Sequence, residues 1–142
     1  MFAGSGAPPD VDGLAQLNLV GDGEIPVARI EGGIDISNAR ELGDALLEIG
    51  GESALGLVVD LSGVDYLDSA GVRLVLRLAT ELDRRGRLLG VVGPADAPVR
   101  SVLELTAVDR YVPLYERVED AVAAVRAEGG RARPEGTRTP RA

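Results

Sequence analysis

The chain lacks cysteine, histidine, lysine and tryptophan, and these absences exclude most common catalytic sites. All 15 basic residues are arginines, and aromatic residues make up only 3% of the 142 positions. Without cysteine there is no disulfide framework, no thiol nucleophile and no zinc–thiolate site. Without histidine there is no Ser-His-Asp triad, and without lysine there is no Walker-type phosphate loop and no Schiff base. An enzyme that uses carboxylates alone is the class that stays open.

Long apolar runs are also missing. The longest, such as 56–59 and 88–92, span only a few residues, far fewer than a bilayer requires. The N-terminus has no basic start followed by an apolar stretch, so the sequence predicts no signal peptide. We therefore expect a cytoplasmic protein without a membrane partner.

The charge is unevenly distributed. The segment 129–142 carries four arginines and one glutamate, a net charge of +3. Because the whole chain has a net charge of −8, the remaining residues together carry −11. An acidic body repels the phosphates of DNA and RNA, which argues against a nucleic-acid partner. The aperiodic ends predict a disordered segment over 1–13, a folded domain over 14–127 and a disordered, Arg-rich tail over 128–142.

Hydrophobic periodicity predicts an α/β domain. Strands are expected at 16–20, 25–30, 55–61, 88–92 and 112–115, the first two as a hairpin, and glycines 32 and 33 are expected to end the second. Helices are expected at 39–49, 69–85, 98–106 and 118–127, with Asn38 and Glu41 at the spacing of a capping box. This order predicts a mixed, mostly parallel sheet of five strands with about four helices.

The stretch 60–72 joins the predicted central strand to the longest helix, at the edge where α/β sheets bind ligands and partners. Ser69 is expected at the first helical residue. Its hydroxyl has two possible roles there. It is either an ordinary N-cap or a phosphorylation site, where a phosphate would lie near free N–H groups and add about −1.5 to −2 charges beside Asp65 and Asp68.

The motif Asp68-Ser69-Ala70-Gly71, preceded by Tyr66-Leu67 and followed by Val72, resembles the signature of the STAS domain, the fold of bacterial anti-sigma factor antagonists. The segment 31–35, Glu-Gly-Gly-Ile-Asp, is similar to the family's turn before the first helix, with Gly33 in place of the usual glutamate. The segment 99–112 resembles the late helix of the family, although Ala107 stands where glycine is frequent. The resemblance covers about residues 14–127.

The resemblance implies a partner-switching mechanism in which this chain is a binder and a substrate, not an enzyme, and needs no cofactor. The unphosphorylated form binds an anti-sigma factor that is also a serine kinase, and the sigma factor is released. Phosphorylation of Ser69 ends the complex, and a phosphatase resets it. The implied partner surface, on a chain that is monomeric when free, comprises Asp35, Ser37, Asp68, Ser69, Ala70, Gly71 and Arg73.

Three alternatives to this interpretation remain open. In a response-regulator receiver domain Asp60 would be the phosphorylated aspartate, but such domains require a lysine that this chain lacks. Asp60 is therefore expected to be a loop-facing residue at a strand end. A magnesium-dependent hydrolase would use Asp35, Asp60, Asp65 and Asp68. The third alternative is a STAS subunit of a stress-sensing assembly.

Overall fold

The computed structural model describes residues 15–21 and 24–131, which form one α/β domain. The segment 1–13, expected to be disordered, lies outside these residues. In chain order the elements are β1 (Ala15–Gly21), β2 (Pro26–Ile34), α1 (Ala39–Gly51), β3 (Gly56–Leu67), α2 (Ser69–Arg84), β4 (Leu88–Val92), α3 (Pro98–Leu105), the 3-10 helix η1 (Val108–Arg110), β5 (Leu114–Tyr115) and α4 (Val118–Arg131).

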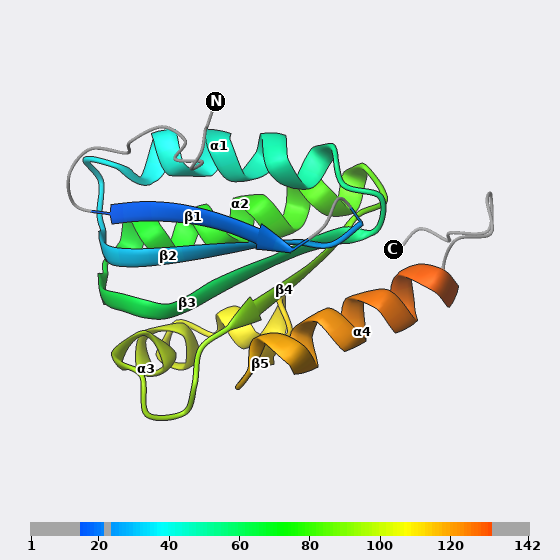
Figure 1. Cartoon of the computed structure of the whole chain (residues 1–142). Coiled ribbons are helices and arrows are strands. Elements are labelled where there is room, and N and C mark those ends of the chain that lie inside the picture. The colour runs from blue at the N-terminus through cyan, green and yellow to red at the C-terminus, as the bar shows by residue number, and fades with distance from the viewer. Residues whose placement is uncertain (1–14, 22–23, 132–142) are drawn as a thin grey trace.

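The strands form one mixed sheet in the order β1-β2-β3-β4-β5. β1 pairs with β2 in antiparallel orientation, and the other three neighbouring pairs are parallel. Helices α1 and α2 cover one face of the sheet, and α3 and α4 lie on the other side (Figure 1). The predicted five-stranded, mostly parallel sheet with four helices is confirmed.

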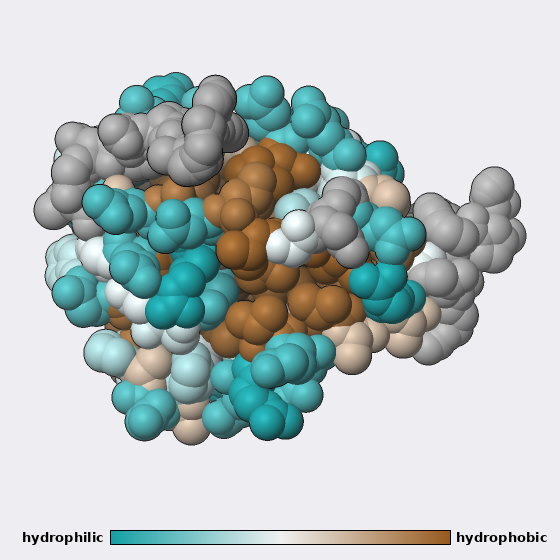
Figure 2. All heavy atoms as spheres, in the orientation of Figure 1, coloured by the Kyte–Doolittle hydropathy of each residue, from teal (hydrophilic) through white to brown (hydrophobic). Residues whose placement is uncertain are grey.

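β3 lies at the centre of the core because both of its faces are covered. Leu57 and Val59 belong to the main apolar cluster, with α1 and α2, whereas Val58 belongs to a smaller cluster with Ala121 and Val125 of α4. This alternation follows from the two-residue period of a strand. Figure 2 shows apolar surface between the strands and α4.

Both central strands run further than predicted. Gly32 and Gly33 were expected to end β2, and this was wrong, since they pair with Val64 and Tyr66 of β3. β3 itself continues to Leu67, six residues past its predicted end at 61. The β2–β3 register shifts twice along this stretch, as at a β-bulge. A local turn signal did not end the strand because pairing with the neighbouring strand satisfies its backbone groups.

The last helix also runs further than predicted. α4 ends at Arg131, so residues 128–131, expected in the disordered tail, are helical. Gly129 is buried, and a Cβ at this position would lie 3.2 Å from the side chain of Leu55. Close packing therefore holds a glycine that would otherwise favour a helix end. No helix in the described part of the chain is long and apolar enough to cross a membrane.

Ala107, between α3 and η1, adopts a left-handed backbone conformation with φ of 63°. This conformation suits glycine and costs an L-residue free energy, because its Cβ crowds the backbone. At this position the resemblance to the STAS domain leads us to expect glycine, so the backbone conformation fits that expectation while the alanine side chain strains it.

Candidate functional site

The turns that follow β2 and β3 lie side by side at one edge of the sheet. Ile34 pairs with Leu67, and the N–H of Asp68 donates to the carbonyl of Ile34 at 3.2 Å. The residues that the sequence singled out on two distant segments therefore meet. We call this surface, formed by residues 35–38, 65–69 and the first turn of α2, the carboxyl edge.

Buried Asn38 organises the first of these turns. Its side chain accepts from the N–H of Asp35 at 3.0 Å and donates to the carbonyl of Gly33 at 2.9 Å. The residue is 0% exposed. The predicted capping box with Glu41 is wrong, because the Asn38 side chain makes no cap hydrogen bond to α1. Sequence reasoning found Asn38 but gave it the wrong role: it fixes the turn before the helix.

Asp35 and Ser37 form a local pair within the same turn. One carboxylate oxygen of Asp35 accepts from the Ser37 hydroxyl at 2.6 Å and from the Ser37 N–H at 2.8 Å. These two hydrogen bonds, the hydroxyl bond first, lower the pKa of Asp35 below its ordinary value. The turn therefore presents a fixed negative charge, and the Ser37 hydroxyl is already engaged.

Asp68, not Ser69, caps α2. The Asp68 carboxylate accepts from the N–H groups of Ala70 at 2.8 Å and Gly71 at 3.3 Å. Ser69 is the first helical residue and is exposed. The N-cap role considered for Ser69 is thus filled by its neighbour, which leaves the serine hydroxyl on the surface.

Ala70 and Gly71 hold the start of α2 close to the sheet. Both are buried. A Cβ on Gly71 would lie 2.8 Å from the Cγ atom of Leu67 and 3.2 Å from a methyl carbon of Ile34, too close without a shift. The structure thus gives these two residues a packing role and leaves little of them for a partner to contact.

The carboxyl edge is acidic. Within the described part of the chain, Asp35, Asp65 and Asp68 form no ion pair, and neither does the exposed Arg73 one turn along α2. Three carboxylates thus lie near a single guanidinium. Any group added to Ser69 would enter a field that is already negative.

Two exposed apolar side chains belong to the same edge and were missed by sequence reasoning. Ile36, between Asp35 and Ser37, is 77% exposed, and Tyr66, which pairs with Gly33, is 56% exposed. The available signal was a lone isoleucine within a polar turn. Large apolar groups beside charges are typical of protein-binding surfaces.

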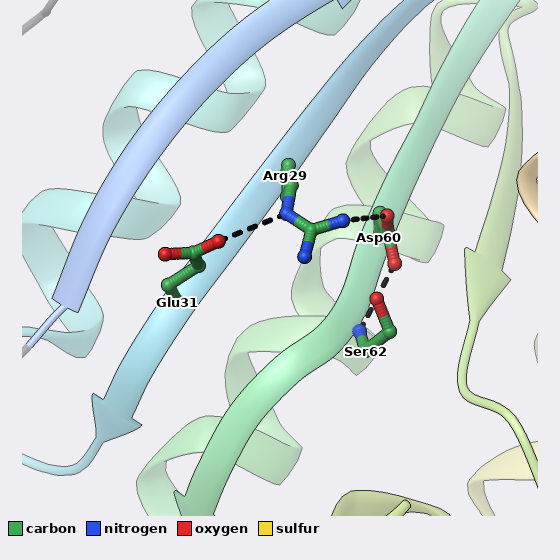
Figure 3. A network of polar contacts seen from close by, with 4 residues as sticks. All are labelled: Arg29, Glu31, Asp60 and Ser62. Atoms are coloured by element: carbon green, nitrogen blue, oxygen red, sulfur yellow. Dashed lines mark hydrogen bonds and ion pairs between the residues drawn. The ribbon is translucent and has the colours of Figure 1, made fainter.

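Asp60 lies far from a strand end, contrary to prediction. It is in the middle of β3, 4% exposed, and its carboxylate accepts from Arg29 of β2 at 3.2 Å and from the N–H of Ser62 at 3.0 Å (Figure 3). Arg29 also contacts Glu31 at 3.0 Å. Hydrogen bonding to Glu31 and the charge of Asp60 raise the pKa of Arg29. We call Arg29, Glu31, Asp60 and Ser62 the Arg29 network.

The four aspartates of the alternative magnesium-dependent hydrolase do not converge. Asp60 lies in the Arg29 network, whereas Asp35 and Asp68 bind backbone N–H groups in their own turns. Among residues 15–21 and 24–131, no group of three or more acidic side chains could hold a metal ion. The arrangement favours a surface that docks a partner over a carboxylate-based hydrolase.

Comparison with known proteins identifies the family of this fold. Residues 16–121 match the family model of the STAS domain. The anti-sigma-F factor antagonist RsfB of Mycobacterium tuberculosis is 30% identical over 107 residues, which are 75% of this chain and 84% of RsfB.

Solved structures are similar over most of the chain. The crystal structure of an anti-sigma factor antagonist from Mycobacterium paratuberculosis has a TM-score of 0.70 and 30% identity, and the match covers 79% of this chain and 94% of that one. The Bacillus cell fate determinant SpoIIAA in its phosphorylated form has a TM-score of 0.56 and 19% identity, with 77% and 98% covered, which shows a shared fold alone.

Proposed function

Because the chain belongs to the STAS domain family, we propose that it is an anti-sigma factor antagonist whose binding is switched off by phosphorylation of Ser69. In this proposal the unphosphorylated form binds an anti-sigma factor serine kinase and frees a sigma factor, and a phosphatase later restores Ser69. The chain itself binds and is modified, and it performs no catalysis. The name of its relative RsfB, an anti-sigma-F factor antagonist, supports the assignment.

The observation that supports the switch is that Asp68, and not Ser69, caps α2. A serine that caps a helix is held by its hydrogen bond to a backbone N–H. Here Asp68 makes that bond, and Ser69 is exposed beside it. A kinase can therefore reach the hydroxyl without breaking the cap.

The same geometry explains why a phosphate would end binding. The N–H groups of Ala70 and Gly71, which could otherwise hold a phosphate at the helix N-terminus, already donate to Asp68. The added charge of about −1.5 to −2 is then presented outward, beside the carboxylates of the carboxyl edge. A partner whose surface matched the unphosphorylated edge would face concentrated negative charge.

Ile36 and Tyr66 provide the apolar part of the proposed docking surface, and Arg73 provides its positive charge. Both apolar side chains are more than half exposed. Burial of such groups by a partner removes apolar area from water and supplies most of the affinity at many interfaces. Asp35 and Ser37 complete the surface from the neighbouring turn.

The direct test is phosphorylation by the anti-sigma factor kinase co-purified from the native host. Incubation with ATP followed by mass spectrometry should place one phosphate on Ser69. Ser69→Ala should bind the kinase and resist phosphorylation, whereas Ser69→Asp should bind at least about tenfold more weakly, since a like charge is added to the interface. Ser101→Asp, on exposed α3, is the matched control and should bind normally. A phosphate on Ser37, Ser62 or Ser101 alone would overturn the proposal.

The docking surface has its own test. Ile36→Ala and Tyr66→Ala should each weaken kinase binding about tenfold, with stability changed by less than about 0.5 kcal/mol. Leu105→Ala is the control, because Leu105 is 86% exposed at the end of α3, outside the carboxyl edge. Arg73→Glu should weaken binding more than Arg84→Glu at the far end of α2. Equal losses of binding in Arg73→Glu and Arg84→Glu would show that the interface does not lie at the carboxyl edge.

A subunit of a stress-sensing assembly is the second candidate, because the same fold would serve either role. Size-exclusion chromatography with light scattering separates the two. The proposed antagonist is a cytoplasmic monomer that binds its kinase, whereas an assembly subunit would elute as a large complex with other STAS proteins.

A further inference from the structure

Three polar or charged residues are buried in the described part of the chain: Asn38, Ser53 and Asp60. Asp60 pairs with Arg29, and the hydroxyl of Ser53 donates to the carbonyl of Gly50 at 2.7 Å, at the end of α1. Asn38 is the one of the three that lies at the carboxyl edge, directly before α1. A buried amide costs free energy unless its hydrogen bonds are satisfied, so the groups that it binds show what it holds in place.

Asn38 binds the turn before α1 at several points. Its side-chain amide donates to the carbonyl of Gly33 at 2.9 Å and accepts from the N–H of Asp35 at 3.0 Å. Its own N–H donates to the carbonyl of Asp35 at 3.2 Å, and its carbonyl accepts from the N–H of Leu42 at 3.0 Å. One residue therefore connects the end of β2, the turn and the first turn of α1.

Ile36 lies in the middle of this turn and is 77% exposed. The hydrogen bonds lie on both sides of it, since Asn38 holds the N–H of Asp35, and the carboxylate of Asp35 holds the N–H of Ser37. A large apolar side chain is unfavourable in water, so a loose turn would let Ile36 move against nearby apolar surface. The ordered turn keeps this side chain on the outside, where a partner can cover it.

We propose that Asn38 is a positioning residue for partner binding, whose buried amide holds the turn in the shape that presents Asp35 and Ile36. This role rests on the proposed function and adds the residue that prepares the docking surface. A turn that is ordered before the encounter loses little backbone entropy on binding, whereas a loose turn loses more and binds more weakly. Asn38 itself is 0% exposed, so it acts through the turn and not by touching the partner.

The test compares Asn38→Ala with Ser53→Ala in the full chain. Each variant removes one buried polar group, and Ser53 follows the far end of α1, about 20 Å along the helix axis from Asn38. Both should lower the midpoint of thermal unfolding. Binding to the anti-sigma factor kinase co-purified from the native host is then measured at a temperature where both variants are folded. Asn38→Ala should bind at least about tenfold more weakly, and Ser53→Ala should change the affinity by less than about twofold.

A second measurement follows the turn in the free chain by NMR. In Asn38→Ala the amide of Ser37 should exchange faster, and the pKa of Asp35 should move back toward 3.8, because the bonds from Ser37 that lower it are loosened. Ser53→Ala should change neither. Asn38→Ser, whose short hydroxyl can replace only part of the amide, should have an affinity between those of the wild type and Asn38→Ala, and it provides the comparison if the alanine variant does not fold.

Equal losses of affinity in Asn38→Ala and Ser53→Ala would show that Asn38 contributes only to general stability, and would overturn the proposal. A loosened turn with unchanged affinity would also overturn it. Failure of the wild-type chain to bind the kinase is a different result, because it would overturn the proposed function and the role of Asn38 with it.

Discussion

The carboxyl edge and the Arg29 network both place acidic side chains along β2 and β3, but they hold them in different ways. At the edge, Asp35 and Asp68 bind backbone groups two or three residues away in the sequence. In the network, Asp60 binds Arg29, which is 31 residues away, and its side chain is 6% exposed.

This difference separates a site from a structural element. Carboxylates held by their own turns stay exposed, so partners can sense them and a neighbouring serine can be modified. A carboxylate held across two strands is removed from solvent, and its charge requires a permanent counterion. We therefore expect changes in the Arg29 network to affect folding and changes at the carboxyl edge to affect binding.

The largest stability effect is expected for Arg29→Met, which leaves the buried Asp60 carboxylate without its guanidinium. The free energy of unfolding should fall by about 3 kcal/mol, as measured by urea denaturation. The matched control is Arg77→Met, which breaks the exposed pair with Asp44 at 2.9 Å and should cost at most about 0.5 kcal/mol. Equal losses would show that Asp60 is not held by Arg29.

A smaller effect is expected for the cap of α2. Asp68→Ala removes the acceptor of two N–H groups and should cost about 1 kcal/mol. Ser69→Ala should change stability by less than about 0.5 kcal/mol, because Ser69 does not cap the helix. Urea denaturation of both variants measures the two losses in the free energy of unfolding. A larger loss for Ser69→Ala than for Asp68→Ala would show that Ser69 caps the helix.

Outside both regions, Ala107→Gly should stabilise the chain. Glycine relieves the strain of a φ of 63°, and the larger entropy of the unfolded glycine offsets part of the gain. The net gain should be about 0.5 kcal/mol, visible as a rise of a few degrees in the melting midpoint. Ala123→Gly, at an exposed position within α4, is the control and should lower the stability.

The smallest effect concerns acid pH at the carboxyl edge. The pKa of Asp35 is lowered from 3.8 by the Ser37 hydroxyl and N–H, so the ionised form is favoured in the folded state. Its contribution to stability is present above pH 3.8 and is lost as the pH falls through the lower folded pKa. Urea denaturation between pH 2 and 5 should show a weaker dependence in Asp35→Asn. Ser37→Ala should bring the Asp35 pKa, measured by NMR titration, closer to 3.8.

The sequence was sufficient for some features that one short segment determines, although not for the capping box of Asn38 and Glu41. β4 was predicted at its observed bounds of 88 and 92, because a continuous apolar run between turns is typical of a buried parallel strand. Ser69 was placed at the first residue of α2, because the Asp-Ser-Ala-Gly motif and the apolar period begin together. The absence of whole residue types excluded most common catalytic sites, because no fold can supply a missing side chain.

What the sequence could not determine depended on contacts between distant segments. The continuation of β2 through Gly32 and Gly33, the length of β3 and the last turn of α4 rest on neighbours far along the chain. Asp60 resembled a strand-end carboxylate until Arg29 was placed beside it. Local propensity depends on a residue and its immediate neighbours, whereas burial, strand pairing and charge pairing depend on three-dimensional packing, which only the tertiary structure decides.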